Sequence, residues 1–434
     1  MVAFTRKIKS LFQSSDQDQP VVIARHHHKV SRKLISAAAL KVLYRLNKAG
    51  YAAYLVGGGV RDLLLKRKPK DFDIATDARP EEVRKLFRNS RLIGRRFRLV
   101  HVQFYDETIE VSTFRAGVSS DTNSDEVTTM VTSDNTYGSI EEDAWRRDFT
   151  VNALYYNIED FSVVDYTGGM QDIKKNMIRM IGDPEQRYRE DPVRLLRALR
   201  LSAKLNFEIE KKTEAALIEL PDLLEQVSPA RLFDEILKMF FKGHSVQTYK
   251  QLDRYNYLHA LFPQTADALK ERNSATDRTL IKLALRATDS RFSQGQSLNP
   301  GFLMAVLLWP AVLLQLKREQ SKHTRYYQVL HSAIENVIKT QNETFYISKR
   351  LQSMMRNVWI QQYHLVNRRG KRIYRTLMHR YFRAAYDFLE LRVKSGEKEF
   401  EEPYLWWKRF QSVKSTEQHA MMDKLVQKKQ KKKK

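Results

Sequence analysis

The apolar and polar positions of the 434-residue chain predict a mixed N-terminal part and a helical remainder. Residues 31–50 carry apolar side chains at helical spacing, and residues 52–56 form an apolar run that suits a short buried strand. Two alternating segments, 100–104 and 109–113, predict a hairpin. From Met170 onward strand signals nearly vanish. We therefore expect an α+β fold, with helices on one face of a small mixed sheet and an all-α continuation.

The loops and helix caps between these elements indicate where one domain ends and the next begins. Residues 116–136 contain almost no large apolar side chain and predict a long loop, and a capping box at residues 139–142 predicts a helix that continues to Asn157. A further strand is expected over 161–166. We expect a flexible basic segment with a surface histidine triplet (1–30), a head domain (31–169), a helical neck (170–245), a helical body (246–415) and a disordered basic tail (416–434).

The most apolar run, Gly301–Leu316, is shorter than a membrane span and contains Pro310, so we interpret it as a buried helix. The first fifteen residues lack the apolar core of a secretory signal. The chain contains no cysteine, which excludes disulfides and thiolate metal sites. These features predict a soluble cytoplasmic protein without a transmembrane segment.

The formal net charge is +25, from 76 Lys and Arg against 51 Asp and Glu. Such an excess implies a polyanionic partner, either nucleic acid or an anionic membrane surface. The lysine-rich end, 428–434, adds exposed positive charge whose contribution to phosphate binding depends on salt.

The stretch 54–76 combines three glycines with a pair of aspartates. Gly57 and Gly58 allow a sharp turn and a close approach to a ligand, and the helix that follows, with Arg61, favours phosphate. We expect a second strand that carries both Asp71 and Asp73, so that both project from the same face, where they would repel without a cation. The alternatives are a divalent-metal site facing a triphosphate and a solvated strand edge after a turn.

Three further clusters have the polarity expected around a nucleotide. Asp148 and Asn152, in RRDFTVNAL, are four residues apart and share a face of the predicted helix. Asp191 and Arg194, in EDPVRLLRALR, are three residues apart, and further arginines continue the same ridge. GRRFRLVH, which begins at Gly94, is a basic loop entering a strand. The simpler interpretation of the first two is a solvated or salt-bridged helix face.

One chemistry unites these pieces. Two divalent ions held by the aspartates activate a 3′-hydroxyl and stabilise leaving pyrophosphate during in-line attack on an α-phosphate. An Asp–Arg pair reads a base edge without a template, because the carboxylate accepts from an exocyclic amine and the guanidinium donates to a ring nitrogen.

LVGGGVRDLLL with DFD, then RRDFTVNAL and EDPVRLLRALR, resemble the nucleotidyltransferase family of CCA-adding enzymes and bacterial poly(A) polymerases. The resemblance extends from about residue 31 to 241, and GRRFRLVH is similar to the poly(A) polymerase branch. It implies a nucleotidyltransferase head, a helical neck that binds nucleotide and RNA, and a helical body that binds RNA. The implied reaction is template-independent transfer of AMP from ATP to RNA 3′ ends with two Mg²⁺ ions. RNA-decay machinery is the further partner we expect.

The resemblance also assigns roles to residues of this chain. It implies that Asp71, Asp73 and Asp148 are the catalytic acids and that the first two bind metal. The nucleotide-binding residues would be Gly57, Gly58, Arg61, Arg147, Asn152, Asp191, Arg194 and Arg197. We add Glu110 as a further metal-binding carboxylate, because it lies on the polar face of its predicted strand.

Two alternatives remain. A CCA-adding enzyme shares every catalytic residue, so only GRRFRLVH separates it from a poly(A) polymerase. A non-catalytic RNA-binding protein of the same fold is disfavoured by the intact DFD. One departure from the family is Lys66, which stands where a glycine commonly follows LLL and alters the helix end.

Overall fold

The computed structural model describes residues 19–94, 98–116, 136–272, 274–320 and 325–431. The chain forms two compact units. The first comprises Met1–Arg194 and Leu205–Leu220, and the second comprises Leu195–Lys204 and Pro221–Lys434. The predicted long loop and the basic segment of GRRFRLVH lie largely outside the described residues.

The first unit is built on an eight-stranded sheet in the order β1-β8-β7-β2-β3-β6-β5-β4. The pairing of β3 with β6 is parallel and the other pairings are antiparallel, which confirms the predicted mixed sheet. The strands are β1 (Val21–Ile23), β2 (Ala53–Val56), β3 (Asp73–Thr76), β4 (Ser90–Ile93), β5 (Leu99–Gln103), β6 (Thr108–Thr113), β7 (Leu154–Asn157) and β8 (Val163–Asp165).

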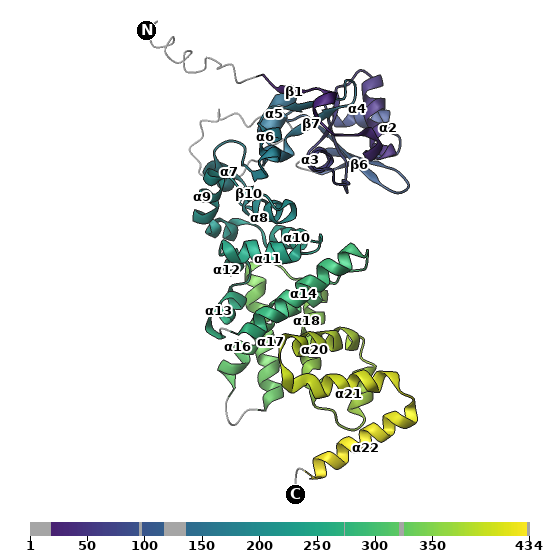
Figure 1. The fold of residues 1–434 in the computed structure, drawn as a ribbon, viewed down its shortest axis with the longest axis vertical. Coiled ribbons are helices and arrows are strands. Elements are labelled where there is room, and N and C mark those ends of the chain that lie inside the picture. The colour runs from purple at the N-terminus through teal and green to yellow at the C-terminus, as the bar shows by residue number, and fades with distance from the viewer. Residues whose placement is uncertain (1–18, 95–97, 117–135, 273, 321–324, 432–434) are drawn as a thin grey trace. The chain divides into compact units, whose positions relative to one another are not determined.

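Helices pack on this sheet from both sides (Figure 1). Leu55, Ile74 and Val111 are register partners on one face, where α2 (Ala37–Lys48) and α4 (Pro80–Leu86) contact the strands. The opposite face buries Val56 and Tyr155 against α5 (Ile140–Trp145). The expectation of helices on one face is therefore wrong. The unit is completed by α3 (Gly58–Leu64), α6 (Gly169–Lys174), α7 (Pro184–Glu190), α9 (Lys211–Glu219) and the short parallel pair β9 (Met177–Ile178) and β10 (Glu208–Ile209).

Lys66, the position at which the sequence departs from the family, lies directly after the last turn of helix α3 and does not change the bonding that ends the helix. Lys66 N–H donates to the Leu63 carbonyl at 3.0 Å, and Arg67 N–H donates to the Asp62 carbonyl at 2.8 Å. These two bonds form a Schellman motif, in which the left-handed position is usually glycine. Here Lys66 occupies that position with φ of +57°.

The segment 139–157 differs from the predicted single helix. Helix α5 stops at Trp145, a short 3₁₀ helix covers Thr150–Asn152, and the chain then enters β7. Competing local bonds explain the break, because Asp148 Oδ1 accepts from Phe149 N–H at 2.8 Å. The capping box at Ser139 is confirmed.

The N-terminal and C-terminal regions also contain structure that the sequence does not predict. Within the segment expected to be flexible, β1 pairs with β8. His28 of the histidine triplet is buried, and its Nε2 lies 2.9 Å from the Phe161 carbonyl oxygen. At the other end, α22 (Ser415–Lys431) occupies most of the region expected to be disordered.

The second unit is helical throughout the part that the structure describes. The apolar run forms two buried helices that meet at 46°, with Pro310 in the first turn of the second. Among the described residues, this bent pair alone meets a length and composition test for a membrane span, and no single helix does. The helices are α8 (Val193–Leu205, entered from the first unit), α10 (Pro229–Phe240), α11 (Ser245–Arg254), α12 (Tyr257–Leu261), α13 (Pro263–Arg272), α14 (Ala275–Ser293), α15 (Pro300–Leu307), α16 (Trp309–Glu319), α17 (Tyr326–Thr344), α18 (Lys349–Val366), α19 (Arg372–Leu377), α20 (Phe382–Ser395), α21 (Glu401–Ser412) and α22.

Candidate active site

Two carboxylates lie side by side at the centre of the sheet. Asp73 on β3 is the register partner of Glu110 on β6, so both side chains project from the same face. On the far side of Glu110, His101 Nε2 lies 3.6 Å from Glu110 Oε2. Asp71 precedes β3 and is exposed, so the expectation that both aspartates lie on the strand is wrong for Asp71.

The electrostatics of Asp73 show that these carboxylates are close. Burial raises the pKa of Asp73 to about 6, and the negative charges of Glu110 and Asp71 contribute to the rise. The positive charge of Arg147 acts in the opposite direction. The positive charge near Asp73 is therefore too small to offset its burial and the repulsion from the neighbouring carboxylates.

The glycine turn passes directly beside this carboxylate. Gly57 has φ of +69°, a left-handed conformation that favours glycine. A Cβ on Gly57 would lie 3.6 Å from Arg147 Nη1 and 3.9 Å from Asp73 Oδ2. A Cβ on Gly58 would lie 3.2 Å from Arg61 Nη2. The turn thus brings the backbone close to an acid and to two arginines.

Arg147 is held rigidly in this position. Its Nε donates to the Tyr155 hydroxyl at 2.9 Å, and its Nη2 donates to Asp143 Oδ2 at 2.8 Å. The Tyr155 hydroxyl donates to the same carboxylate oxygen at 2.7 Å. Although burial lowers the pKa of Arg147, the charges and hydrogen bonds of Tyr155 and Asp143 outweigh it and raise that pKa overall. A permanent positive charge therefore stands beside Asp73.

Arg61 connects the glycine turn to Asp148. Its buried guanidinium donates to Asp62 Oδ1 at 2.7 Å and to Asn152 Oδ1 at 2.5 Å. Asn152 Nδ2 donates in turn to Asp148 Oδ1 at 3.2 Å. Asp148 and Asn152 therefore meet as predicted, although a turn and a 3₁₀ helix bring them together rather than an α-helix.

The other predicted nucleotide residues lie on α7 and α8. Arg194 Nη1 donates to the Arg187 carbonyl at 2.7 Å and to Glu190 Oε2 at 3.0 Å. Asp191 separates the two helices, and its Oδ1 accepts from Val193 N–H at 3.3 Å. Arg197 lies one turn beyond Arg194 on α8.

Arg187 joins these helices to the RRD segment, and the sequence did not single it out. Its Nη2 donates to the Arg146 carbonyl at 2.7 Å and to the Arg147 carbonyl at 2.8 Å. Its Nη1 donates to Glu190 Oε2 at 2.8 Å. The Asp191–Arg194 pair and the Arg147–Asp148 pair are therefore connected through one guanidinium.

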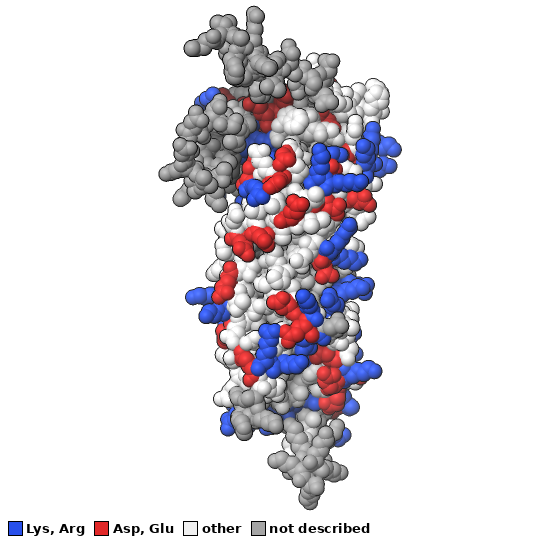
Figure 2. Space-filling view, turned by 90° about the vertical axis from the view of Figure 1, so that its left-hand side faces the viewer, with Lys and Arg blue, Asp and Glu red and all other residues white. Residues whose placement is uncertain are grey.

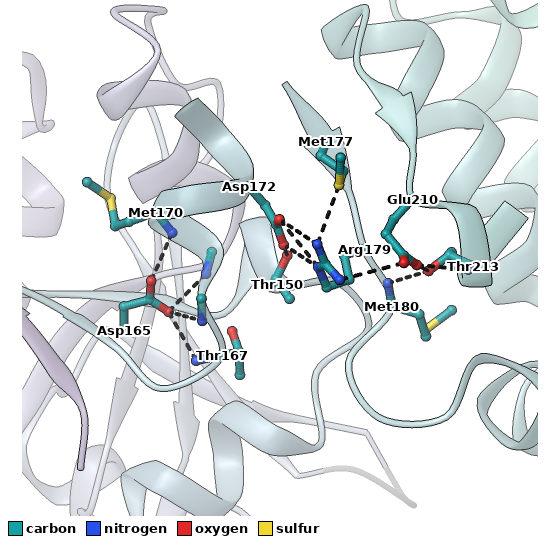
Figure 3. Close-up of polar contacts among 12 residues, drawn as sticks. Thr150, Asp165, Thr167, Met170, Asp172, Met177, Arg179, Met180, Glu210 and Thr213 are labelled. Atoms are coloured by element: carbon teal, nitrogen blue, oxygen red, sulfur yellow. Dashed lines mark hydrogen bonds and ion pairs between the residues drawn. The ribbon is translucent and has the colours of Figure 1, made fainter. Parts of the chain in front are cut away.

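A second polar network, shown in Figure 3, contacts the short 3₁₀ helix Thr150–Asn152 that holds Asn152. Thr150 Oγ1 donates to Asp172 Oδ2 at 2.7 Å, and Arg179 Nε donates to this oxygen at 3.0 Å. Arg179 Nη1 also lies 3.6 Å from Glu210 Oε1, beside Thr213 at the start of α9. Sequence reasoning missed these residues, because their partners are far apart along the chain.

The donor set fits a hard divalent cation. Asp71, Asp73 and Glu110 supply carboxylate oxygens, the ligands that Mg²⁺ prefers. A cation would also offset the repulsion that raises the pKa of Asp73. Within the described residues, no three His, Asp or Glu side chains are already arranged to coordinate a metal.

Comparisons with known proteins agree with this geometry. The profile of the poly A polymerase head domain matches residues 53–179. A profile described as the probable RNA- and SrmB-binding site of polymerase A matches 206–269, and one for the polymerase A arginine-rich C-terminus matches 322–434. Together these profiles cover strands β2 to β8 of the sheet, part of the helical continuation and the C-terminal helices.

Relatives match over different lengths. Poly(A) polymerase I of Salmonella typhi is 46% identical over 97% of this chain and 93% of its own length. The CCA-adding enzyme of Lactobacillus helveticus is 41% identical, but over 49% of this chain and 52% of its own length. A solved apo structure of a tRNA-processing enzyme has a TM-score of 0.58 at 22% identity, covering 88% of this chain and 99% of that chain. This last likeness shows the fold alone.

Proposed function

Because this chain belongs to the poly(A) polymerase family of nucleotidyltransferases, we propose that it transfers AMP from ATP to RNA 3′ ends without a template. The 3′-hydroxyl loses its proton to solvent as its oxygen forms a bond to the α-phosphorus of ATP. The bond from that phosphorus to the α–β bridging oxygen breaks and releases pyrophosphate. The observation that carries this proposal is the convergence of Asp73, Glu110, the glycine turn and Arg147 on one face of the sheet.

Asp71 and Asp73, with Glu110, are the residues we expect to hold two Mg²⁺ ions. When bound, such ions activate the attacking hydroxyl and stabilise the charge that develops on the leaving group. Asp148 is the third catalytic acid in this proposal. Its contact with Asn152 and, through it, with Arg61 fixes its carboxylate in the site.

The triphosphate would lie against the turn at Gly57 and Gly58, where the backbone is open to close approach. Arg147, which Asp143 and Tyr155 hold in place, supplies positive charge to the phosphates. Arg61, bonded to Asn152, supplies a second positive charge on the same side of the nucleotide. Because both of these arginines already have carboxylate partners, their positions are set before a nucleotide binds.

The base would be recognised by Asp191 and Arg194, with Arg197 on the same ridge of α8. Two bonds from Arg194 Nη1, to the Arg187 carbonyl and to Glu190, fix the plane of its guanidinium. A fixed plane allows the remaining donors to discriminate between base edges by geometry.

RNA is the second substrate. On the face shown in Figure 2, Lys and Arg side chains are interspersed with Asp and Glu, so this face is not uniformly basic. We therefore expect RNA to contact local basic regions of the helical part. Action in the cytoplasm and association with RNA-decay machinery are further parts of this proposal.

A CCA-adding activity is the second candidate, because the Lactobacillus helveticus CCA-adding enzyme is 41% identical over 49% of this chain. Both reactions would use the same acids. The two differ in product, since one yields a long A tract on generic RNA and the other stops after CCA on tRNA.

The test supplies purified protein with labelled ATP or CTP and either a generic RNA or a tRNA lacking its terminal CCA. We expect a long A tract on the generic RNA with ATP. Termination after CCA on tRNA, without extension of the generic RNA, would overturn the proposal in favour of the second candidate.

Asp73→Asn tests the catalytic site. We expect AMP incorporation to fall about a thousand-fold, as when one group that stabilises the transition state is lost. Asp106→Asn, at an exposed position in the turn before β6, is the matched control and should leave the rate unchanged. If Asp73→Asn retained the wild-type rate, Asp73 could not be a catalytic acid.

A further inference from the structure

A long segment of the second unit contains no acidic residue. From 344 to 386 the sequence has no Asp or Glu, whereas Lys and Arg occur ten times. This acid-free segment includes α18, α19 and the start of α20. Its basic residues are Lys349, Arg350, Arg356, Arg368, Arg369, Lys371, Arg372, Arg375, Arg380 and Arg383.

Most of the basic side chains around α19 are exposed. The exposed side chains are those of Arg369, Lys371, Arg372 and Arg375. Arg368 differs, because it is buried and pairs with Glu402. The exposed residues therefore give this part of the second unit a local positive charge that no acid within the segment offsets.

An aromatic group lies where α17 begins and α18 ends. It consists of Tyr326, Tyr327, Tyr363 and His364, and its ring centroids are 5.3 to 5.9 Å apart in the four contacting pairs. Tyr326 stacks on Tyr363 with an interplanar angle of 20°. Although both pack on Tyr363, Tyr326 and Tyr327 remain 43% and 38% exposed.

The aromatic group and the acid-free segment form one surface. Tyr363 and His364 belong to the segment itself, and Arg372 is close enough to help lower the pKa of His364, after the larger effect of burial. Arg325, which is exposed, immediately precedes Tyr326. Exposed aromatic rings among arginines are typical of sites that stack the bases of single-stranded nucleic acid and contact its phosphates.

We propose that this surface binds a single-stranded segment of the RNA substrate, with bases stacked on Tyr326 and Tyr327 and phosphates contacting Arg369 and Arg372. The proposal rests on the proposed function, because that function makes RNA the ligand. It adds a binding site on the second unit that is separate from the catalytic carboxylates. A protein or lipid partner would use the same positive charge but would not require planar rings.

The experiment measures binding of full-length protein to labelled oligo(A) and to an abasic oligomer of the same length. Tyr326→Ala with Tyr327→Ala should weaken oligo(A) binding at least about five-fold, the lower limit for loss of one stacked ring. Binding of the abasic oligomer should be unchanged. Tyr326→Phe with Tyr327→Phe, the matched control, keeps both rings and should bind oligo(A) as the wild type does.

The dependence of affinity on salt concentration distinguishes the phosphate contacts from base stacking. Arg369→Gln with Arg372→Gln should reduce the dependence of affinity on salt concentration, whereas the double alanine variant should keep the wild-type dependence. A double leucine variant at Tyr326 and Tyr327 preserves apolar bulk without rings, and it replaces the alanine variant if that variant does not fold.

Two results would overturn the inference: unchanged oligo(A) affinity after ring removal, or an equal loss for the abasic oligomer. AMP addition at saturating RNA should remain at the wild-type rate in the ring variants. If the wild type bound oligo(A) through these rings but added no AMP, the proposed function would fail and the inference would stand.

Discussion

Asp73 lies where its negative charge costs folding free energy. It is largely buried, it faces Glu110 across two strands, and Asp71 is two residues away. Each of these neighbours disfavours the ionised form, and the positive charge of Arg147 offsets the effect only in part. Such strain is common where a protein prepares a site for a ligand that carries the missing charge.

The pH dependence of stability should reveal this strain. The pKa of Asp73 is raised to about 6 from 3.8, so the folded protein binds this proton more tightly than the unfolded chain does. The resulting penalty is absent below about pH 4, grows as pH rises to about 6, and is then constant at about 3 kcal/mol. Without metal, Asp73→Asn should therefore raise the unfolding temperature at neutral pH but not at pH 4.

Thermal unfolding in a chelating buffer measures this difference, and added Mg²⁺ provides the control. Mg²⁺ should stabilise the wild type at neutral pH more than it stabilises Asp73→Asn. An equal change in unfolding temperature at both pH values would show that the Asp73 charge is not strained.

At the scale of elements, α7 acts as the connection between two parts of the candidate site. Its Arg187 donates to the carbonyls of Arg146 and Arg147 and to Glu190, and its backbone carbonyl accepts from Arg194. A planar guanidinium makes these separate bonds at once, whereas a lysine ammonium is a compact point donor. The orientation of Arg194 relative to Arg147 should therefore depend on Arg187.

Arg187→Lys should lower kcat/KM for ATP about ten-fold and reduce the preference for ATP over CTP. The reason is that loss of one charged hydrogen bond, about 1.5 kcal/mol, frees the Asp191–Arg194 pair to shift. Arg189→Gln is the matched control, because Arg189 forms an exposed pair with Glu185 on the same helix. Steady-state kinetics with both nucleotides check the prediction, which is wrong if the two variants behave alike.

The elements that the sequence predicts correctly are those with strong local patterns. The hairpin at residues 99–113 shows a clear alternation, and the strand before the glycine turn is a short apolar run that ends at glycines. The apolar run around Pro310 is buried and helical as predicted, but it forms two helices rather than one. The run from Ala153 to Tyr156 is apolar at every position, and periodicity alone does not separate a central strand from a buried helix. Tertiary pairing with β2 decides for a strand.

The candidate site could be predicted in its residues but not in its connections. The motif residues cluster because β2, β3 and β6 are neighbours, and Glu110 joins them through parallel register. Arg187 and Arg179 could not be predicted, because their partners are backbone carbonyls or acids that only the fold brings near. Asp71 differs from expectation because β3 begins two residues later.

At the scale of the whole molecule, the net charge of +25 does not form one basic patch on the face that Figure 2 shows, because the Lys and Arg side chains there are interspersed with Asp and Glu. Regions with an unbalanced charge therefore matter more than the total. Besides the acid-free segment, the clearest is the lysine-rich end, 428–434.

Removal of residues 428–434 should weaken RNA binding more at low salt than at high salt, because exposed lysines bind phosphates mainly through release of counterions. Titrations of one labelled RNA at several salt concentrations measure the effect. Replacing the same lysines with arginine preserves the charge and should restore the wild-type dependence. An equal loss at every salt concentration would contradict the electrostatic explanation.

The short strand β1 has a consequence for self-association. Its three residues pair with Val163–Asp165 and so cover one edge of the eight-stranded sheet. If the chain began after Ile23, β8 would present unpaired N–H and C=O groups beside the buried side chains of its own sheet. An uncovered edge of this kind is a template for a strand from another copy. In this sheet β1 takes the place of β8 at the edge, and because it is only three residues long it is a poorer template for such pairing, so we expect Val21–Ile23 to oppose edge-to-edge aggregation.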